Sequence, residues 1–182
     1  MAQARILPLN PPKRSLNAPD PQRLKLLRAL ERKILWLSSW MIHHANQVRP
    51  RRDGLKVGGH QASSASSVTL LTALYLHALR AEDRVAVKPH ASPVFHAIQY
   101  LLGRQTVDNL KRFRALGGAQ SYPSRTKDID DVQDYVQLKK LTPAEAKRGR
   151  MVAIVGDAEF DEGNVFEAML EGWKHDVRDL WW

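Results

Sequence analysis

The chain has 182 residues, of which 43% are hydrophobic and 26% charged, and its formal net charge is +9. This length and composition suit one globular domain of ordinary size. The absence of cysteine excludes disulfides and thiol catalysis, and no apolar run approaches the roughly 20 residues that span a membrane. The N-terminus also lacks the apolar stretch of a secretory signal, so we expect a cytoplasmic protein.

The positive charge is concentrated at the N-terminus. Residues 1–52 hold 11 Lys and Arg against 2 Asp and Glu, whereas the remaining residues hold 17 of each sign. A basic arm can bind polyanions such as nucleic acid, but an acidic partner or a solvated face explains the charge equally simply. We favour the latter interpretations, because no groove-reading motif accompanies the charge.

The N-terminal third predicts an arm followed by a long helix. Five prolines within residues 1–22 favour an extended arm. Asp20-Pro21 is typical of a helix start, and apolar residues recur at helical spacing to about residue 47. We therefore expect a basic, Pro-rich arm with an amphipathic helix over residues 1–53, and a second unit over 54–182.

The middle of the chain alternates between helical and extended patterns. Thr106 is expected to cap a helix that the glycines 117–118 end. The predicted elements are helices over 63–79, 94–102, 107–116 and 133–141, a strand over 83–88, an acidic loop over 127–132, and a further helix from Pro143.

The C-terminal part contains the segment on which the functional interpretation depends. Residues 151–155 form a short apolar, β-branched run that predicts a buried parallel strand, and Gly156-Asp157 follows it directly. A helix is predicted over 160–175, with a new strand beginning in 176–182. A strand that ends in Gly-Asp before a helix is where α/β proteins place phosphate and metal chemistry. We also expect the chain to be a fragment, since a sheet edge is left open at its end.

Four ordered motifs make the chain recognisable. It resembles the N-terminal, diphosphate-binding part of thiamine-diphosphate enzymes of the transketolase superfamily, and most of all the homodimeric pyruvate dehydrogenase decarboxylating components. The motifs are Gly59-His60-Gln61-Ala62-Ser63-Ser64, Lys88-Pro89-His90-Ala91-Ser92-Pro93, Ser121-Tyr122-Pro123 and Gly156-Asp157-Ala158-Glu159-Phe160-Asp161-Glu162.

The resemblance implies both a fold and a site. The fold would be a partial α/β domain of the thiamine-diphosphate-binding type, a doubly wound parallel sheet flanked by helices and incomplete at the C-terminus. His60 and His90 would be catalytic and would line the space over the thiazolium ring. The other positions that the resemblance assigns to the cofactor are Tyr122, Gly156, Asp157, Ala158 and Glu159, of which Asp157 would also bind Mg²⁺.

The resemblance also implies partners. The intact protein would be a homodimer acting on a 2-oxo acid or a ketose phosphate, and its basic arm could dock on the acyl-transferase core of a dehydrogenase complex. No membrane partner is expected, and we favour an acidic protein partner over nucleic acid.

The sequence departs from the family pattern at several points. Ala158 stands where relatives usually have glycine, and Ser124 stands where pyruvate-type relatives have histidine. A glycine-rich segment is missing between Val132 and Gln133. The downstream asparagine that completes the metal site and the second domain are also missing. We therefore expect this chain alone to be inactive, and three alternatives stay open: a transketolase, a truncated non-catalytic paralogue and a basic nucleic-acid-binding protein.

Overall fold

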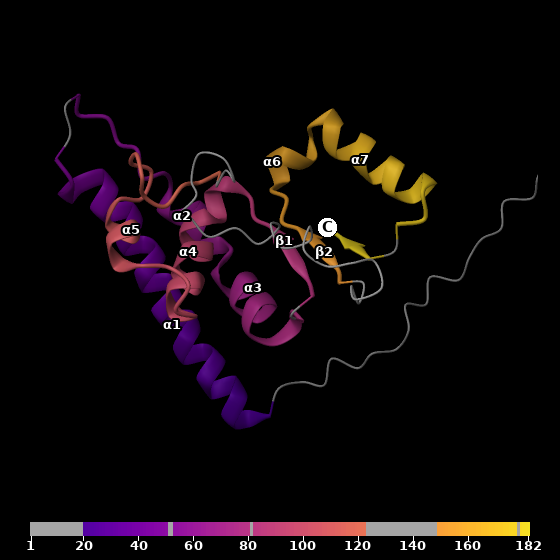
Figure 1. Ribbon diagram of the computed structural model, residues 1–182, viewed down its shortest axis with the longest axis horizontal. Helices are drawn as coiled ribbons and strands as arrows, with labels where there is room; N and C mark the ends of the chain where they lie inside the picture. The colour runs from indigo at the N-terminus through magenta and orange to yellow at the C-terminus, as the bar shows by residue number, and fades with distance from the viewer. Residues whose placement is uncertain (1–19, 51–52, 81, 123–148, 178) are drawn as a thin grey trace, which may run out of the picture.

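The computed structural model describes residues 20–50, 53–80, 82–122, 149–177 and 179–182. Figure 1 shows helices on both sides of a small central sheet. The elements of the first half are α1 (Pro21–His43), a π-helical turn η1 (His44–Val48), α2 (Gln61–Ser66), α3 (Val68–Ala73), a π-helical turn η2 (Leu74–Ala78), β1 (Arg84–Ala86), a short 3-10 helix η3 (Pro89–Ala91), α4 (Ser92–Leu101) and α5 (Val107–Lys111). After residue 148 come β2 (Met151–Ala153), α6 (Asp157–Phe160), α7 (Gly163–Lys174) and β3 (Leu180–Trp181).

The sheet has three parallel strands in the order β1-β2-β3. Val85 lies opposite Val152 across the first pair, and Val152 lies opposite Trp181 across the second. Both valines are buried, as the apolar pattern of a parallel strand requires. The predicted α/β class, a partial parallel sheet flanked by helices, is therefore confirmed, together with the predicted strand near the C-terminus.

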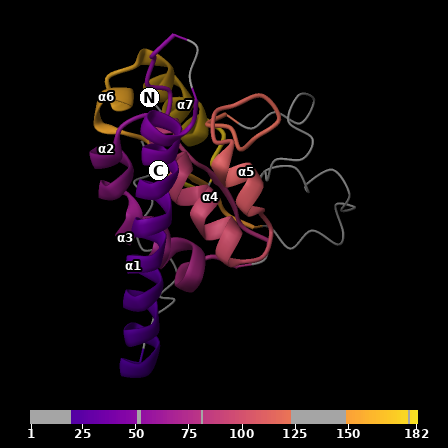
Figure 2. The ribbon, with the colours of Figure 1, turned by 90° about the vertical axis from the view of Figure 1, so that its left-hand side faces the viewer.

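The first helix begins where its sequence predicts. Pro21 is its first residue, and the Asp20 carboxylate accepts a hydrogen bond of 2.9 Å from the backbone N–H of Arg23. Ile34, Leu37 and Met41 are buried against the body, but the first turns extend past the other elements (Figure 2). The long helix is therefore held by its C-terminal half.

The main core lies between the sheet and the helices α1, α3 and α4. Ile34 of α1, Val94 and Ile98 of α4, and Val85 and Val152 of the sheet belong to one buried cluster. Burying apolar side chains of this size contributes about 1.5–3 kcal/mol each. Because α1 supplies part of this core, it is integral to the described fold; the domain boundary predicted after residue 53 stays a prediction.

The helix predicted over 63–79 is present but interrupted. It forms as α2, α3 and the π-helical turn η2, and Ser67 separates α2 from α3. The Ser67 hydroxyl donates a hydrogen bond of 2.8 Å to the carbonyl of Ser64. The Ser67 backbone N–H donates to the same carbonyl at 3.1 Å, so the chain tightens at the point where the helix is interrupted.

The helix predicted over 107–116 is shorter than expected. Thr106 does cap it, accepting from the N–H of Asn109 at 3.2 Å, but α5 ends at Lys111. The chain then turns through Arg114, whose φ is +58°, and the Arg114 N–H donates to the Ala119 carbonyl at 2.7 Å. These bonds join residues that a continuous helix would hold apart, so the glycines at 117–118 belong to a compact loop.

The C-terminal helix begins later than predicted. The helix predicted over 160–175 forms as α7 (Gly163–Lys174), and Asp161 and Glu162 separate it from the short helix α6 that precedes it. Phe160 packs edge-on against Phe166 across this joint, with ring centroids 6.0 Å apart. No residue of α7 is buried. The elements predicted over 127–132, 133–141 and from Pro143 lie outside the described residues.

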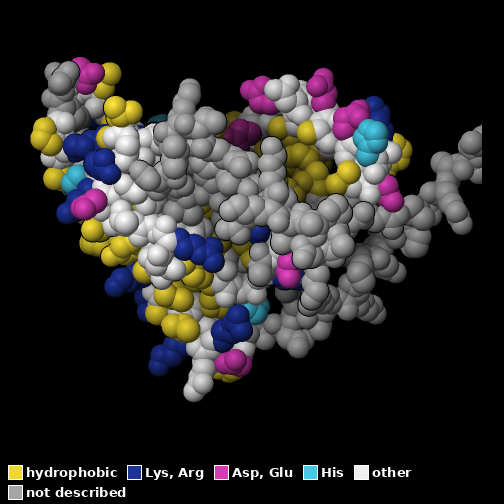
Figure 3. All heavy atoms as spheres, in the orientation of Figure 1, with side chains coloured by type: hydrophobic (Ala, Val, Ile, Leu, Met, Phe, Trp, Pro, Cys, Tyr) yellow, Lys and Arg dark blue, Asp and Glu magenta, His cyan; other side chains and the backbone are white. Residues whose placement is uncertain are grey.

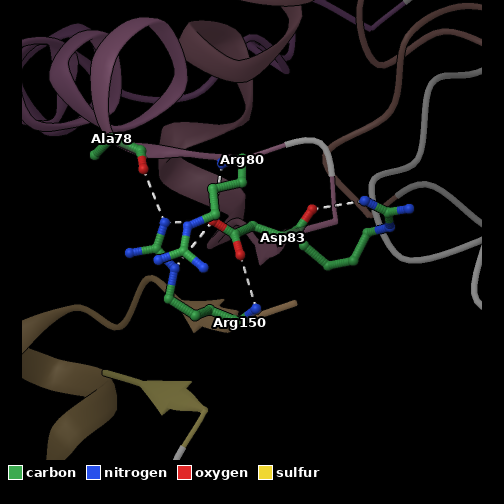
Figure 4. A network of polar contacts seen from close by, with 5 residues as sticks. Ala78, Arg80, Asp83 and Arg150 are labelled. Atoms are coloured by element: carbon green, nitrogen blue, oxygen red, sulfur yellow. Dashed lines mark hydrogen bonds and ion pairs between the residues drawn. The ribbon is translucent and has the colours of Figure 1, made fainter. Parts of the chain in front are cut away.

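A buried ion pair fixes the two strands where they enter the sheet (Figure 4). The side chain of Asp83 is fully buried, and that of Arg150 is 10% exposed. One Asp83 oxygen accepts from the Arg150 N–H at 2.7 Å, and the other accepts from the Arg80 N–H at 2.9 Å and from Arg150 Nε at 3.0 Å. Arg150 Nη2 also bonds to this second oxygen. Both carboxylate oxygens therefore accept hydrogen bonds, one from a single donor and the other from three.

Arg150 extends the same junction to two further segments. Its Nη2 donates to the Ala78 carbonyl at 2.8 Å, and its guanidinium lies 4.1 Å from the centroid of the Trp181 ring. Next to it, an added Cβ on Gly149 would come within 2.0 Å of the Glu82 backbone carbonyl. Glycine is therefore required at position 149, where the segments that lead into β1 and β2 approach each other.

Removing the charge of Asp83 should weaken the whole fold. We expect Asp83→Asn to lower the free energy of unfolding by about 3–5 kcal/mol, because it leaves the buried Arg150 guanidinium without its counter-charge. Asp108→Asn is the matched control: Asp108 is exposed and 4.0 Å from Lys111, so its loss should cost less than about 1 kcal/mol. Urea unfolding monitored by circular dichroism measures both, and equal losses would contradict this role of Asp83.

Candidate functional site

The predicted motifs gather at the edge of the sheet where β1 and β2 end. The two strands are parallel, with Ala86 opposite Ala153, and the Ile154 N–H donates to the Ala86 carbonyl at 2.9 Å. The segment that follows β1 leads into Lys88-Pro89-His90, and the segment that follows β2 leads into Gly156-Asp157. The loops that follow the two strands thus lie side by side at the carboxyl edge of the sheet, where α/β proteins place such chemistry.

The two predicted catalytic histidines lie against each other. His60 immediately precedes α2, and His90 lies in η3. Their ring centroids are 5.8 Å apart with an angle of 59° between the planes, and both residues are exposed. Two accessible imidazoles at this spacing can both donate or accept protons on one bound molecule.

Gly156 and Glu159 form the loop at the end of β2. The Gly156 N–H donates to Glu159 Oε2 at 2.6 Å, which turns the Glu159 carboxylate back over the start of α6. Gly156 is buried, whereas Asp157 and Ala158 are exposed in the first turn of α6. The loop therefore presents the Asp157 carboxylate to solvent and holds Glu159 in place.

Lys88 connects the two strand ends and was missed by the motif analysis. An added Cβ on Gly156 would lie 2.0 Å from Lys88 Nζ, so the ammonium rests where Gly156 has no side chain. Lys88 Nζ is also 3.8 Å from Glu159 Oε2. In the sequence, the role of Lys88 is indicated by its place at the start of the motif that contains Pro89 and His90.

The candidate site fits an anion better than it fits a metal ion. Lys88 supplies a part-buried cation, whose ammonium lies where Gly156 has no side chain. The described residues contain no group of three His, Cys, Asp or Glu side chains that could hold a metal. Mg²⁺ prefers carboxylates together with phosphate oxygens and water, and here Asp157 is the exposed carboxylate that could serve.

Tyr122 belongs to the His60 side of the site. Its side chain is 76% exposed, and in the described part of the chain it makes no hydrogen bond or ring contact with His60, His90 or Gly156. Arg114 ties its loop to the His60 loop: Nη1 donates to the Val57 carbonyl at 3.0 Å and Nε donates to Ser121 Oγ. Burial lowers the pKa of the Arg114 guanidinium, and the neighbouring Tyr122 raises this pKa.

Comparison with known proteins relates part of the chain to one kind of enzyme. It is 38% identical to the pyruvate dehydrogenase E1 component of Mycolicibacterium smegmatis over 101 residues, which are 50% of this chain and 10% of the relative. The E1 component of Mycobacterium tuberculosis is 36% identical over the same shares. That of Escherichia coli K12 is 32% identical over 112 residues, 57% of this chain and 12% of the relative.

These similarities are partial. The chain spans about a tenth of the length of the curated relatives that it matches. No protein-family model matches it. The comparisons support a relationship to pyruvate dehydrogenase E1 components over about half of the chain, and they leave the roles of single residues as predictions.

Arg114 should be required to hold the Tyr122 loop in place. We expect Arg114→Met to lower the free energy of unfolding by about 1–2 kcal/mol, because the part-buried Ser121 hydroxyl and the exposed Val57 carbonyl lose their donor. Amide hydrogen exchange, measured by mass spectrometry, should rise over residues 57–60 and 119–122. Arg112→Met is the control, since the Arg112 guanidinium donates to the Asn109 side chain at 3.0 Å on an exposed surface. Unchanged exchange in both variants would refute the role of Arg114.

Proposed function

We propose that the chain carries the cofactor-facing part of a thiamine-diphosphate-dependent enzyme that decarboxylates a 2-oxo acid of the pyruvate type. The observation that carries this proposal is the ring contact between His60 and His90, at a centroid distance of 5.8 Å. They come from motifs about 30 positions apart in sequence, and Lys88, two residues before His90, reaches the Gly156 loop. The partial similarity to pyruvate dehydrogenase E1 components favours decarboxylation over transketolase chemistry.

Each predicted residue has a role that its position allows. Gly156 would let the diphosphate approach the backbone, because it carries no Cβ. Asp157, exposed at the start of α6, would be a Mg²⁺ ligand. His60 and His90 would hold or move protons on the bound substrate. When bound, thiamine diphosphate would supply the electron sink that decarboxylation requires.

Three further predicted contacts belong to the same proposal. Ala158 would leave room beside the diphosphate, since its side chain is a single methyl group. Glu159 would keep the loop in its conformation through the bond from the Gly156 N–H. Tyr122, which is largely exposed, would contact the cofactor from the His60 side. The loop after β2 and the loops around His60 and Tyr122 would thus approach the cofactor from different directions.

The partners of the intact enzyme are proposed on charge and on the resemblance. Lys and Arg side chains gather over α1, whereas Asp and Glu side chains gather around α6 and α7 (Figure 3). The exposed bases of α1 are Arg23, Lys25, Arg28, Arg32 and Lys33. This surface would suit an acidic face of a partner such as the acyl-transferase core of a dehydrogenase complex.

Homodimerisation of the intact protein is proposed on the resemblance alone. No helix among the described residues is long and apolar enough to cross a membrane.

Cofactor binding tests the proposed function directly. We expect isothermal titration calorimetry with Mg²⁺ present to detect saturable binding of thiamine diphosphate to the 182-residue chain. Asp157→Ala should raise Kd at least about tenfold by removing a carboxylate ligand, a change of about 1.4 kcal/mol. Asp161→Ala, which removes a neighbouring exposed carboxylate, should leave Kd unchanged. No heat of binding at about 1 mM cofactor would rule out the proposal, since binding would then be weaker than about −4 kcal/mol.

A further inference from the structure

The Lys88 ammonium donates no hydrogen bond to any other described residue. Its side chain is 20% exposed, and its nearest described carboxylate oxygen, Glu159 Oε2, is 3.8 Å away. That distance is too long for a hydrogen bond, and no hydrogen bond from Lys88 Nζ occurs among the described residues. An ammonium has three N–H donors. A largely buried cation in this state is expected to find an anionic or polar partner.

The surroundings of the ammonium set the kind of partner that fits. Nζ lies over Gly156, at 2.0 Å from the position of an added Cβ, so the ammonium itself occupies the space that a side chain at 156 would fill. Glu159 Oε2 already accepts the Gly156 N–H at 2.6 Å, so this oxygen is engaged with the loop. Among the described residues, the Gly156 N–H is thus already bonded, whereas the Lys88 ammonium beside it keeps donors for a ligand.

We propose that Lys88 binds the diphosphate group directly, as a cationic contact additional to the metal site at Asp157. This inference rests on the proposed function, because the diphosphate is that of thiamine diphosphate. A lysine ammonium binds phosphate oxygens as a point charge and needs no fixed geometry. Lys88 comes from the end of β1 and Asp157 from the end of β2, so the two groups would hold the diphosphate from neighbouring strands.

The position of Lys88 also couples anion binding to the histidine pair. Lys88 is separated from His90 by Pro89, and η3 spans Pro89–Ala91. Pro fixes one backbone dihedral angle, so the backbone between Lys88 and His90 has little freedom. A diphosphate held by Lys88 would therefore lie next to the segment that carries His90. Lys88 is thus a binding and positioning residue and takes no part in proton transfer.

Titration with inorganic pyrophosphate and with thiamine diphosphate tests this proposal. In calorimetry on the full chain with Mg²⁺ present, Lys88→Met should raise Kd for both compounds about tenfold, which corresponds to about 1.4 kcal/mol. Lys88→Arg, which keeps the charge, should retain most of the affinity. Lys174→Met is the matched control, because it removes an exposed lysine that pairs with Glu171 at 2.7 Å, and it should bind as the unaltered chain does.

The outcomes separate this inference from the proposed function. If thiamine diphosphate binds equally well to Lys88→Met, the Lys88 proposal is overturned and the proposed function stands. If pyrophosphate binds in a Lys88-dependent manner but thiamine diphosphate does not bind, the proposed function fails and Lys88 remains an anion-binding residue. Loss of affinity in Lys88→Arg equal to that in Lys88→Met would assign Lys88 a packing role and overturn the proposal. Thermal unfolding of each variant shows whether a change in Kd reflects misfolding.

Discussion

The buried pair Asp83–Arg150 is the interaction on which the rest of the structure depends. Burying a carboxylate and a guanidinium costs several kcal/mol, and the cost is offset only when each group is fully hydrogen-bonded. Asp83 meets this condition with donors from Arg80 and Arg150, and Arg150 also holds the end of η2 and the Trp181 ring. The Arg150 side chain thus joins the N-terminal ends of β1 and β2 and lies against Trp181 of β3.

The alignment of β1 and β2 at their N-terminal ends also determines which residues meet at their C-terminal ends. Parallel strands that start together and pair in register also end together, so the loops after Ala86 and Ala153 meet at one edge. The charge network and the candidate site lie at opposite ends of the same short strands. Each strand is only two or three residues long. A shift of one residue at Arg150 would move Gly156 relative to Lys88 and turn Val152 out of the core.

The candidate site combines a rigid loop with exposed reactive groups. The Gly156 N–H donates to the Glu159 carboxylate, and Arg114 bonds to the loops that carry His60 and Tyr122. The imidazoles and the Asp157 carboxylate remain accessible to solvent. Such a division suits ligand binding, because the backbone is ordered before the ligand arrives while the groups that contact it stay free to respond.

The sequence by itself determined the features that depend on a few neighbouring residues. The Asp20 and Thr106 caps, the apolar strand at 151–153 and the order of the four motifs could all be found from it, since capping and periodicity act over single turns. Only the tertiary structure decided the end of α5, the contact of His60 with His90 and the position of Lys88 over Gly156. It also revealed the pairing of Asp83 with Arg150, 67 positions apart. These features depend on contacts between distant segments, and no local pattern specifies which distant residues will meet.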